Sequence, residues 1–89
     1  MANILGFHKW EWWEDLIVCI YAVNRKTDPK SIRKLSKILS IKPNKIAFRL
    51  SNFTKLAMGH PADWHFSRQE KLVYNVVGLL DIILSIKVK

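Results

Sequence analysis

Two prolines mark where two helices begin in the middle of this chain. Proline lacks a backbone N–H and suits the first position of a helix, where that donor would have no partner. Asp28 precedes Pro29 as a predicted N-cap, so we expect one helix from Pro29 to about Ser40 and another from Pro43. About three residues, "SIK", join them. Two amphipathic helices joined this tightly are typical of a helix-turn-helix, although the glycine usual in that turn is missing.

Apolar residues at helical spacing predict two further helices. One runs from about Trp10 to Asn24, with acids in its first turn, where the helix dipole favours them. The other runs from about Arg68 to Ile86 behind an S-x-x-E capping box. Its many β-branched residues would also suit strands, but the capping box favours a helix. Residues 57–66 contain a glycine and a proline, which predicts a turn-rich loop or short hairpin where a wing would lie.

Size and composition indicate one folded domain over residues 1–89. Hydrophobic residues make up 49% of the 89 residues and charged ones 25%, a balance typical of globular proteins. A lone cysteine, Cys19, has no intramolecular disulfide partner, so a reducing cytoplasm is the expected location. No signal peptide or membrane span is expected. We therefore predict a mainly α, winged helix-turn-helix fold with a three-helix core, a short wing and a long C-terminal helix.

The positive charge of the chain is concentrated in its middle third. The formal net charge is +8, and ten of the fifteen Lys and Arg residues lie between Arg25 and Lys55 with one acid, Asp28. Such a field is the electrostatic footprint of a surface that binds a polyanion, because each contact with a phosphate releases condensed counterions. A solvated basic face without a partner is the alternative.

The third helix is expected to carry the base-reading surface. On a helical wheel Ile46, Leu50 and Phe53 share a narrow core face, and Phe48 points away from it among polar and basic residues. An outward ring could contact a methyl group in the major groove of DNA, or it could pack under the wing or against a tryptophan. The residues predicted to contact bases are Asn44, Lys45, Phe48, Ser51, Asn52 and Lys55. The residues predicted to contact phosphates are Lys30, Arg33, Lys34, Lys37, Lys42, Arg49, His60, Trp64 and His65.

The stretch "IRKLSKILSIKPNKIAFRLSNFTKL" resembles the winged-helix domains that accompany HNH-type and modification-dependent restriction endonucleases. The match includes a lysine before proline and an apolar–x–x–basic–Leu–x–Asn–Phe run, formed by Ile46, Arg49, Leu50, Asn52 and Phe53. The resemblance implies binding of double-stranded DNA, with methylated adenine or cytosine sensed by some members. The segment after Leu56 departs from it, since the glycine-rich hairpin of a wing is absent.

Other interpretations remain beside DNA binding. His60, Asp63 and His65 match no usual zinc spacing, and no nucleophile elbow, paired-carboxylate site or phosphate-binding glycine loop is present, so neither a metal, a cofactor nor catalysis is expected. Unpaired bases of RNA could stack on exposed aromatics instead. The last helix is apolar over much of its circumference, which predicts a homodimer, a fused nuclease domain or another protein partner against it.

Two aromatic and apolar sets are expected in the core. Trp10 and Trp13 share a face of the first helix, and the second helix should bury one stripe. That stripe consists of Ile32, Leu35, Ile38 and Leu39.

Overall fold

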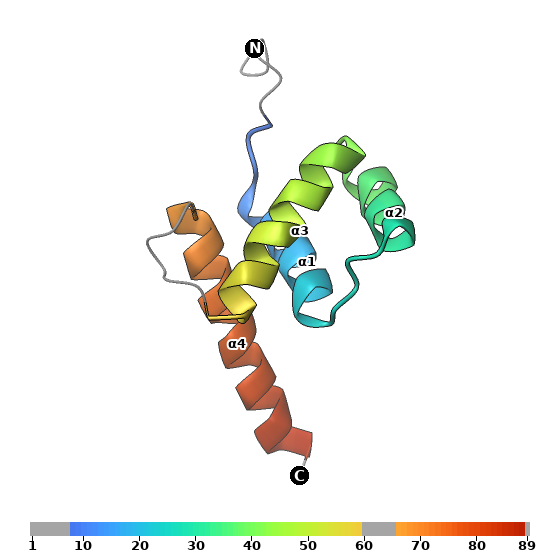
Figure 1. Ribbon diagram of the computed structural model, residues 1–89. Coiled ribbons are helices and arrows are strands. Elements are labelled where there is room, and N and C mark those ends of the chain that lie inside the picture. The colour runs from blue at the N-terminus through green and yellow to red at the C-terminus, as the bar shows by residue number, and fades with distance from the viewer. Residues whose placement is uncertain (1–7, 60–65, 89) are drawn as a thin grey trace.

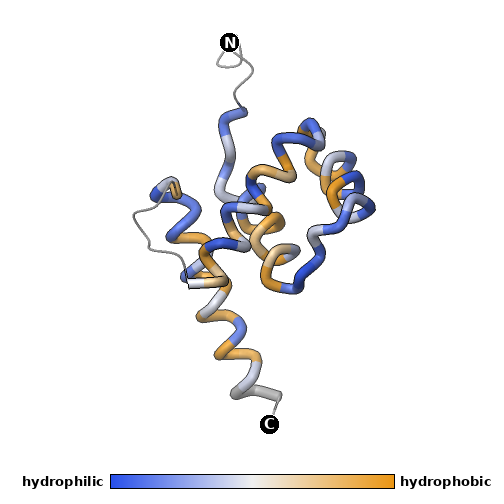
Figure 2. Tube along the Cα trace, in the orientation of Figure 1, coloured by the Kyte–Doolittle hydropathy of each residue, from blue (hydrophilic) through white to orange (hydrophobic). Residues whose placement is uncertain are grey.

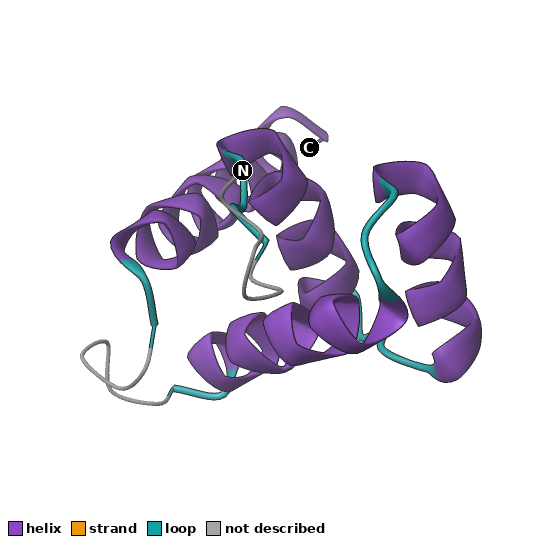
Figure 3. Cartoon of the chain, turned by 90° about the horizontal axis from the view of Figure 1, so that it is seen from above, coloured by secondary structure: helices purple, strands orange, loops and turns teal. Residues whose placement is uncertain are grey.

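The computed structural model describes residues 8–59 and 66–88 of the chain, which form four helices in sequence (Figure 1). They are α1 (Trp12–Val23), α2 (Pro29–Leu39), α3 (Pro43–Ala57) and α4 (Arg68–Val88). Within these two ranges there is no strand (Figure 3). The predicted mainly α class is confirmed, and the strand alternative for the last segment is wrong. Residues 60–65, most of the predicted wing, lie outside the described residues.

Helices α1, α3 and α4 pack together, and α2 packs on α3 (Figure 1). The largest fully buried apolar side chains include Phe53, Leu35, Ile46 and Val18, so every one of the first three helices contributes to one core. From α4 only the N-terminal half enters it, through Val73 and Val77. None of the helices in the described part of the chain has the length and apolarity needed to cross a membrane.

In the turn between α2 and α3, a serine stands at the position where glycine is usual. Ser40 takes a left-handed backbone conformation, with φ of 56° and ψ of 42°, where glycine is usually favoured. The amide of Ile41 donates to the carbonyl of Ser36 at 3.2 Å, and the hydroxyl of Ser36 donates back to the carbonyl of Ile41. Ile41 is itself buried, so its side chain anchors the turn to the core. Residues 29–57 therefore form two helices joined by a short, anchored turn.

Two of the predicted core residues are wrong. Trp13 is 45% exposed, because α1 buries the face that carries Asp15 and Val18, and Trp13 lies about 200° from Asp15 around the helix. Ile38 is 55% exposed, since α2 packs mainly on α3 and the covered stripe is too narrow to include it. Trp10, in contrast, is partly buried against the core as expected.

Cys19 should be chemically inert in the folded protein. Burial raises the pKa of its thiol to about 12, and the nearby Asp15 carboxylate adds to the rise. Because the thiolate is the reactive form, a maleimide at pH 8 should label Cys19 only after unfolding in guanidinium. The thiol of the unfolded chain ionises near its ordinary pKa, whereas the thiol of the folded chain stays neutral there. The contribution of Cys19 to stability is therefore full below that pKa and is lost as the pH rises. Rapid labelling of the folded chain would contradict the buried position.

Candidate nucleic-acid interface

The outer face of α2 is predominantly basic, although Ile38 is also exposed on this helix. Four cations recur at helical spacing on this face, and all are exposed: Lys30, Arg33, Lys34 and Lys37. Among residues 8–59 and 66–88, no carboxylate lies within ion-pair distance of any of them. Their charge is therefore directed to solvent, where it can attract an anionic partner.

The start of α2 is fixed by Asp28, the one acid in this basic region. Its carboxylate accepts hydrogen bonds from the Ser31 hydroxyl at 2.7 Å and the Ser31 amide at 3.3 Å. These bonds, chiefly the one from the hydroxyl, lower the pKa of Asp28 below its ordinary value. The carboxylate thus stays ionised and caps the helix at neutral pH, and its stabilising effect is present above the ordinary pKa and lost as the pH falls.

Helix α3 presents a polar face with one aromatic ring. Asn44, Phe48 and Ser51 are exposed, and Phe48 is 66% accessible. Lys45 and Lys55 lie beside them and are half-buried. The opposite face of α3 is buried as predicted. Phe48 takes no part in the core, so its ring is available on the same surface as the polar side chains.

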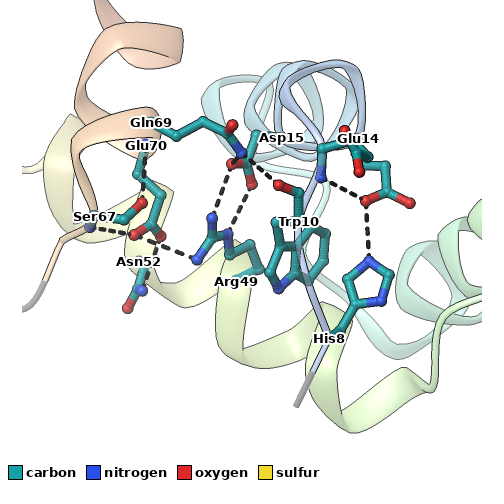
Figure 4. Close-up of polar contacts among 10 residues, drawn as sticks. His8, Trp10, Glu14, Asp15, Arg49, Asn52, Ser67, Gln69 and Glu70 are labelled. Atoms are coloured by element: carbon teal, nitrogen blue, oxygen red, sulfur yellow. Dashed lines mark hydrogen bonds and ion pairs between the residues drawn. The ribbon is translucent and has the colours of Figure 1, made fainter. Parts of the chain in front are cut away.

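A buried polar network lies on the flank of α3 and joins it to α1 and α4 (Figure 4). The guanidinium of Arg49 donates to both carboxylate oxygens of Asp15, at 2.7 and 2.8 Å. Its third nitrogen lies 3.5 Å from the carboxylate of Glu70. The amide of Gln69 donates to Asp15 at 2.6 Å and to the carbonyl of Trp10 at 2.9 Å. Asp15 is 0% exposed and Glu70 1%, so both charges depend on these partners.

Arg49 is consequently a structural residue, and the prediction that it contacts phosphate is wrong. Its side chain is 12% exposed, and its guanidinium also stacks on the indole of Trp10, 4.9 Å from the ring centroid. An arginine neutralised by two buried carboxylates cannot reach outward without leaving both uncompensated. One positive charge of the middle third therefore belongs to the interior.

Asn52 is also misassigned as a base-contacting residue. It is 6% exposed, and its side-chain amide donates to Glu70 at 2.9 Å. The first turn of α4 packs on the flank of α3 at this point and covers the side chain. Lys45 lies on the same flank about two turns earlier and is only half-buried.

The N-terminus of α4 is capped by Glu70, the acid that also bonds Asn52. The Ser67 amide donates to Glu70 at 2.7 Å, and the Glu70 amide donates to the Ser67 hydroxyl at 3.1 Å, which confirms the predicted capping box. Glu70 thus caps α4 while it also holds Asn52 and Arg49 of α3.

A second polar contact continues the network toward the N-terminus. The His8 imidazole lies 2.9 Å from the Glu14 carboxylate, which also accepts from the Glu11 amide at 2.8 Å. The ring of His8 meets that of Trp10 edge-on, with centroids 5.0 Å apart. Residues 8–10 are therefore part of the folded domain.

The remaining predicted phosphate contacts fall in two groups. Lys42 is exposed immediately before α3, whose first turn contains no acid. His60, Trp64 and His65 lie outside the described residues. Within the described ranges, no group of three His, Cys, Asp or Glu side chains could hold a metal ion.

The buried network was not predicted from the sequence, because its partners lie far apart along the chain. The three charged members nevertheless fall on the core spacing of their own helices: Asp15 precedes Val18, Cys19 and Ala22 by three, four and seven residues. Glu70 stands in the same relation to Val73 and Val77, and Arg49 to Asn52, Phe53 and Leu56. An acid and an arginine that both occupy core positions are a signal for a buried ion pair.

No family model, curated protein or solved structure matches this chain.

Replacing Arg49 should test the network directly. Arg49→Met keeps the length of the apolar stem but leaves Asp15 and Glu70 buried with fewer donors, so we expect a loss of about 3–5 kcal/mol in the free energy of unfolding. Small domains have only about 5–15 kcal/mol in total, so urea unfolding at low temperature is the appropriate measurement. Ser51→Ala, on the exposed side of the same helix, is the control and should change stability by about 0.5 kcal/mol or less. An Arg49→Met chain as stable as wild type would contradict the structural role.

Proposed function

We propose that this protein binds double-stranded DNA through α2 and α3, with α3 in the major groove. The observation that carries the proposal is the pairing of two adjacent surfaces: four exposed cations on α2 and an exposed polar face with a phenylalanine on α3. In a helix-turn-helix, the second helix contacts base edges while the first crosses the backbone. The short turn at Ser40 provides the connection that this arrangement needs.

The basic face of α2 is suited to phosphates and not to individual bases. Lysine and arginine side chains at i, i+3, i+4 and i+7 form a row along one side of a helix, which matches a repeating backbone charge. Lys42 and the N-terminus of α3 add positive potential at the adjoining end, since the dipole of a helix favours anions there. These contacts would set position and affinity without sequence preference.

The outer face of α3 supplies the groups that can distinguish bases. Asn44 can bond an adenine edge through both its amide atoms, and Lys45 can donate to guanine. Phe48 can contact a methyl group, either that of thymine or one added to adenine or cytosine. Ser51 and Lys55 complete the reading surface that we propose. A winged helix would need a wing between α3 and α4, a segment of which residues 60–65 lie outside the described residues.

Two double variants, one on α2 and one elsewhere, change the net charge by the same amount and so test where the charge matters. Arg33→Glu with Lys37→Glu should weaken binding to all duplexes and reduce the slope of log affinity against log salt by about 0.9 for each phosphate that the protein no longer neutralises. Lys9→Glu with Arg68→Glu is the matched control, because it changes net charge equally on exposed residues outside α2. It should keep most of the wild-type slope. Equal effects from both pairs would mean that net charge alone, and not the face of α2, attracts DNA.

Competition between duplex and single strands separates the DNA proposal from RNA binding. A surface built for the major groove should prefer duplex DNA at fixed salt, whereas rings that stack on unpaired bases should prefer single-stranded RNA. Stronger binding to single-stranded RNA than to duplex DNA of the same sequence would reject the proposal.

Phe48→Ala should separate a reading role from a folding role. Because the ring is 66% exposed, the substitution should cost far less stability than the roughly 3–5 kcal/mol of a buried phenylalanine. A methyl held against the ring is worth about 1 kcal/mol, scaled from the burial of one methylene, so wild type should prefer a methylated duplex several-fold. The measurement is the affinity for one sequence with and without methyl groups on adenine or cytosine. If wild type shows no preference, or the variant melts normally and keeps it, methyl reading by Phe48 is wrong.

A further inference from the structure

The C-terminal half of α4 extends beyond the other helices and remains apolar (Figures 1 and 2). Val73 and Val77 are buried, but beyond them the large side chains are about half exposed. These are Leu79, Leu80, Ile82, Ile83 and Leu84, with exposed fractions between 48% and 60%. Only one charged residue, Asp81, lies among them. Such a concentration of apolar surface on a small chain indicates a binding surface.

Four of the exposed residues of α4 form a continuous row. Leu72, Val76, Leu79 and Ile83 follow the spacing i, i+4, i+7 and i+11, which places them on one side of the helix. Their exposed fractions are 58%, 48%, 60% and 48%. This α4 stripe lies about 100° around the helix from the residues that enter the core. Folding of a single chain therefore leaves it uncovered.

The two ends of the α4 stripe have different surroundings. Beside Leu72 and Val76, the side chains of Trp12 and Leu16 on α1 form the other wall of an apolar groove of about 520 Å³. Trp12 is 62% exposed there, although its indole is a large apolar side chain. At the other end, Leu79 also lines a larger pocket of about 1030 Å³ with Ile20 of α1 and Met58 at the end of α3, whereas Ile83 lines neither pocket. One molecule thus offers a groove beside Leu72 and Val76 and, farther along α4, a ridge of two exposed side chains, Leu79 and Ile83.

We propose that a second copy of this chain packs against the α4 stripe in antiparallel orientation. The ridge of each copy, Leu79 and Ile83, then lies in the groove of the other, beside Leu72 and Val76 and against Trp12. This register is two-fold symmetric, so every residue of the stripe finds an apolar counterpart. A parallel pair would instead place the two grooves at one end and pack the ridge of each copy only against the ridge of the other.

Area and charge both favour a second copy over a charged partner. Six large apolar side chains, half exposed at about 200 Å² each, offer on the order of 600 Å², close to the roughly 800 Å² per partner of a standard interface. The six are Trp12, Leu72, Val76, Leu79, Leu80 and Ile83. The four residues of the stripe are uncharged and Arg68 is the one charged residue that lines the groove, whereas the excess positive charge lies on α2 and α3. Two copies can associate through it with their basic surfaces apart.

The test is the oligomeric state of the full chain without nucleic acid, measured by sedimentation equilibrium. Wild type should approach twice the mass of 10.4 kDa as concentration rises, and more readily at high salt, since screening reduces repulsion between two chains of charge +8. DNA binding should respond to salt in the opposite direction. The dimer proposal is thus judged separately from the proposed function. A wild-type monomer at millimolar concentration, or a larger open assembly, would overturn it.

Two adjacent isoleucines supply a matched pair of variants. Ile83 belongs to the stripe, whereas Ile82 lies about 90° from its centre and is 58% exposed. Ile83→Glu should raise the dissociation constant by about 100-fold or more, because the charge is buried in both copies. Ile82→Glu should change it by less than about fivefold. Trp12→Ala should weaken the dimer while the circular dichroism of the monomer is unchanged. Equal effects of the two isoleucine variants would overturn the assignment to the stripe.

Cysteine pairing tests the orientation. In the antiparallel register, position 72 faces position 83 of the other copy, so chains with Leu72→Cys and Ile83→Cys should cross-link to each other on mild oxidation. Leu72→Cys alone should not cross-link to itself, because the two copies of position 72 would be about 16 Å apart. The buried Cys19 should not interfere. Efficient self-linking at position 72 would indicate a parallel pair and overturn the proposal.

Discussion

The fold depends on one guanidinium that three helices share. Arg49 of α3 forms a two-point ion pair with Asp15 of α1 and lies 3.5 Å from Glu70 of α4. Asp15 and Arg49 are 34 residues apart in sequence, so only the assembled domain brings them together. A buried ion pair contributes little net stability compared with apolar packing, but removing one partner is costly. Its two-point geometry fits the one relative placement of the three helices that brings these groups together.

That placement also determines which side of α3 meets solvent. Arg49 and Asn52 are held on the flank by α1 and α4, and Leu50 and Phe53 fill the core. The remaining arc of α3 contains Phe48, which cannot turn inward without breaking these contacts. The exposure of its ring therefore agrees with both the periodicity of α3 and the contacts that hold the other faces of this helix. Any function of the outer face of α3 rests on a buried contact that never touches the partner.

Local signals allowed much of the fold to be predicted. Pro29, Pro43 and the Ser67–Glu70 capping box act within a few residues of the helix ends they define, so the observed helix bounds lie close to the predicted ones. The outward position of Phe48 followed from periodicity alone. The roles of Arg49 and Asn52 did not, because their partners lie 34 and 18 residues away. Charge and amide character suggested DNA contacts, whereas tertiary packing assigned both residues to the interior.

The same network separates the chain into two surfaces with different chemistry. Glu70 caps α4 and ties its first turn to α3, so the direction of α4 is fixed at its N-terminal end. A helix of 21 residues is about 32 Å long, which exceeds what a core of this size can cover. The C-terminal half of α4 therefore extends beyond the other helices, and its apolar residues remain exposed. Since the positive charge lies on α2 and α3, the proposed DNA contact and the proposed contact between copies should respond to salt in opposite directions.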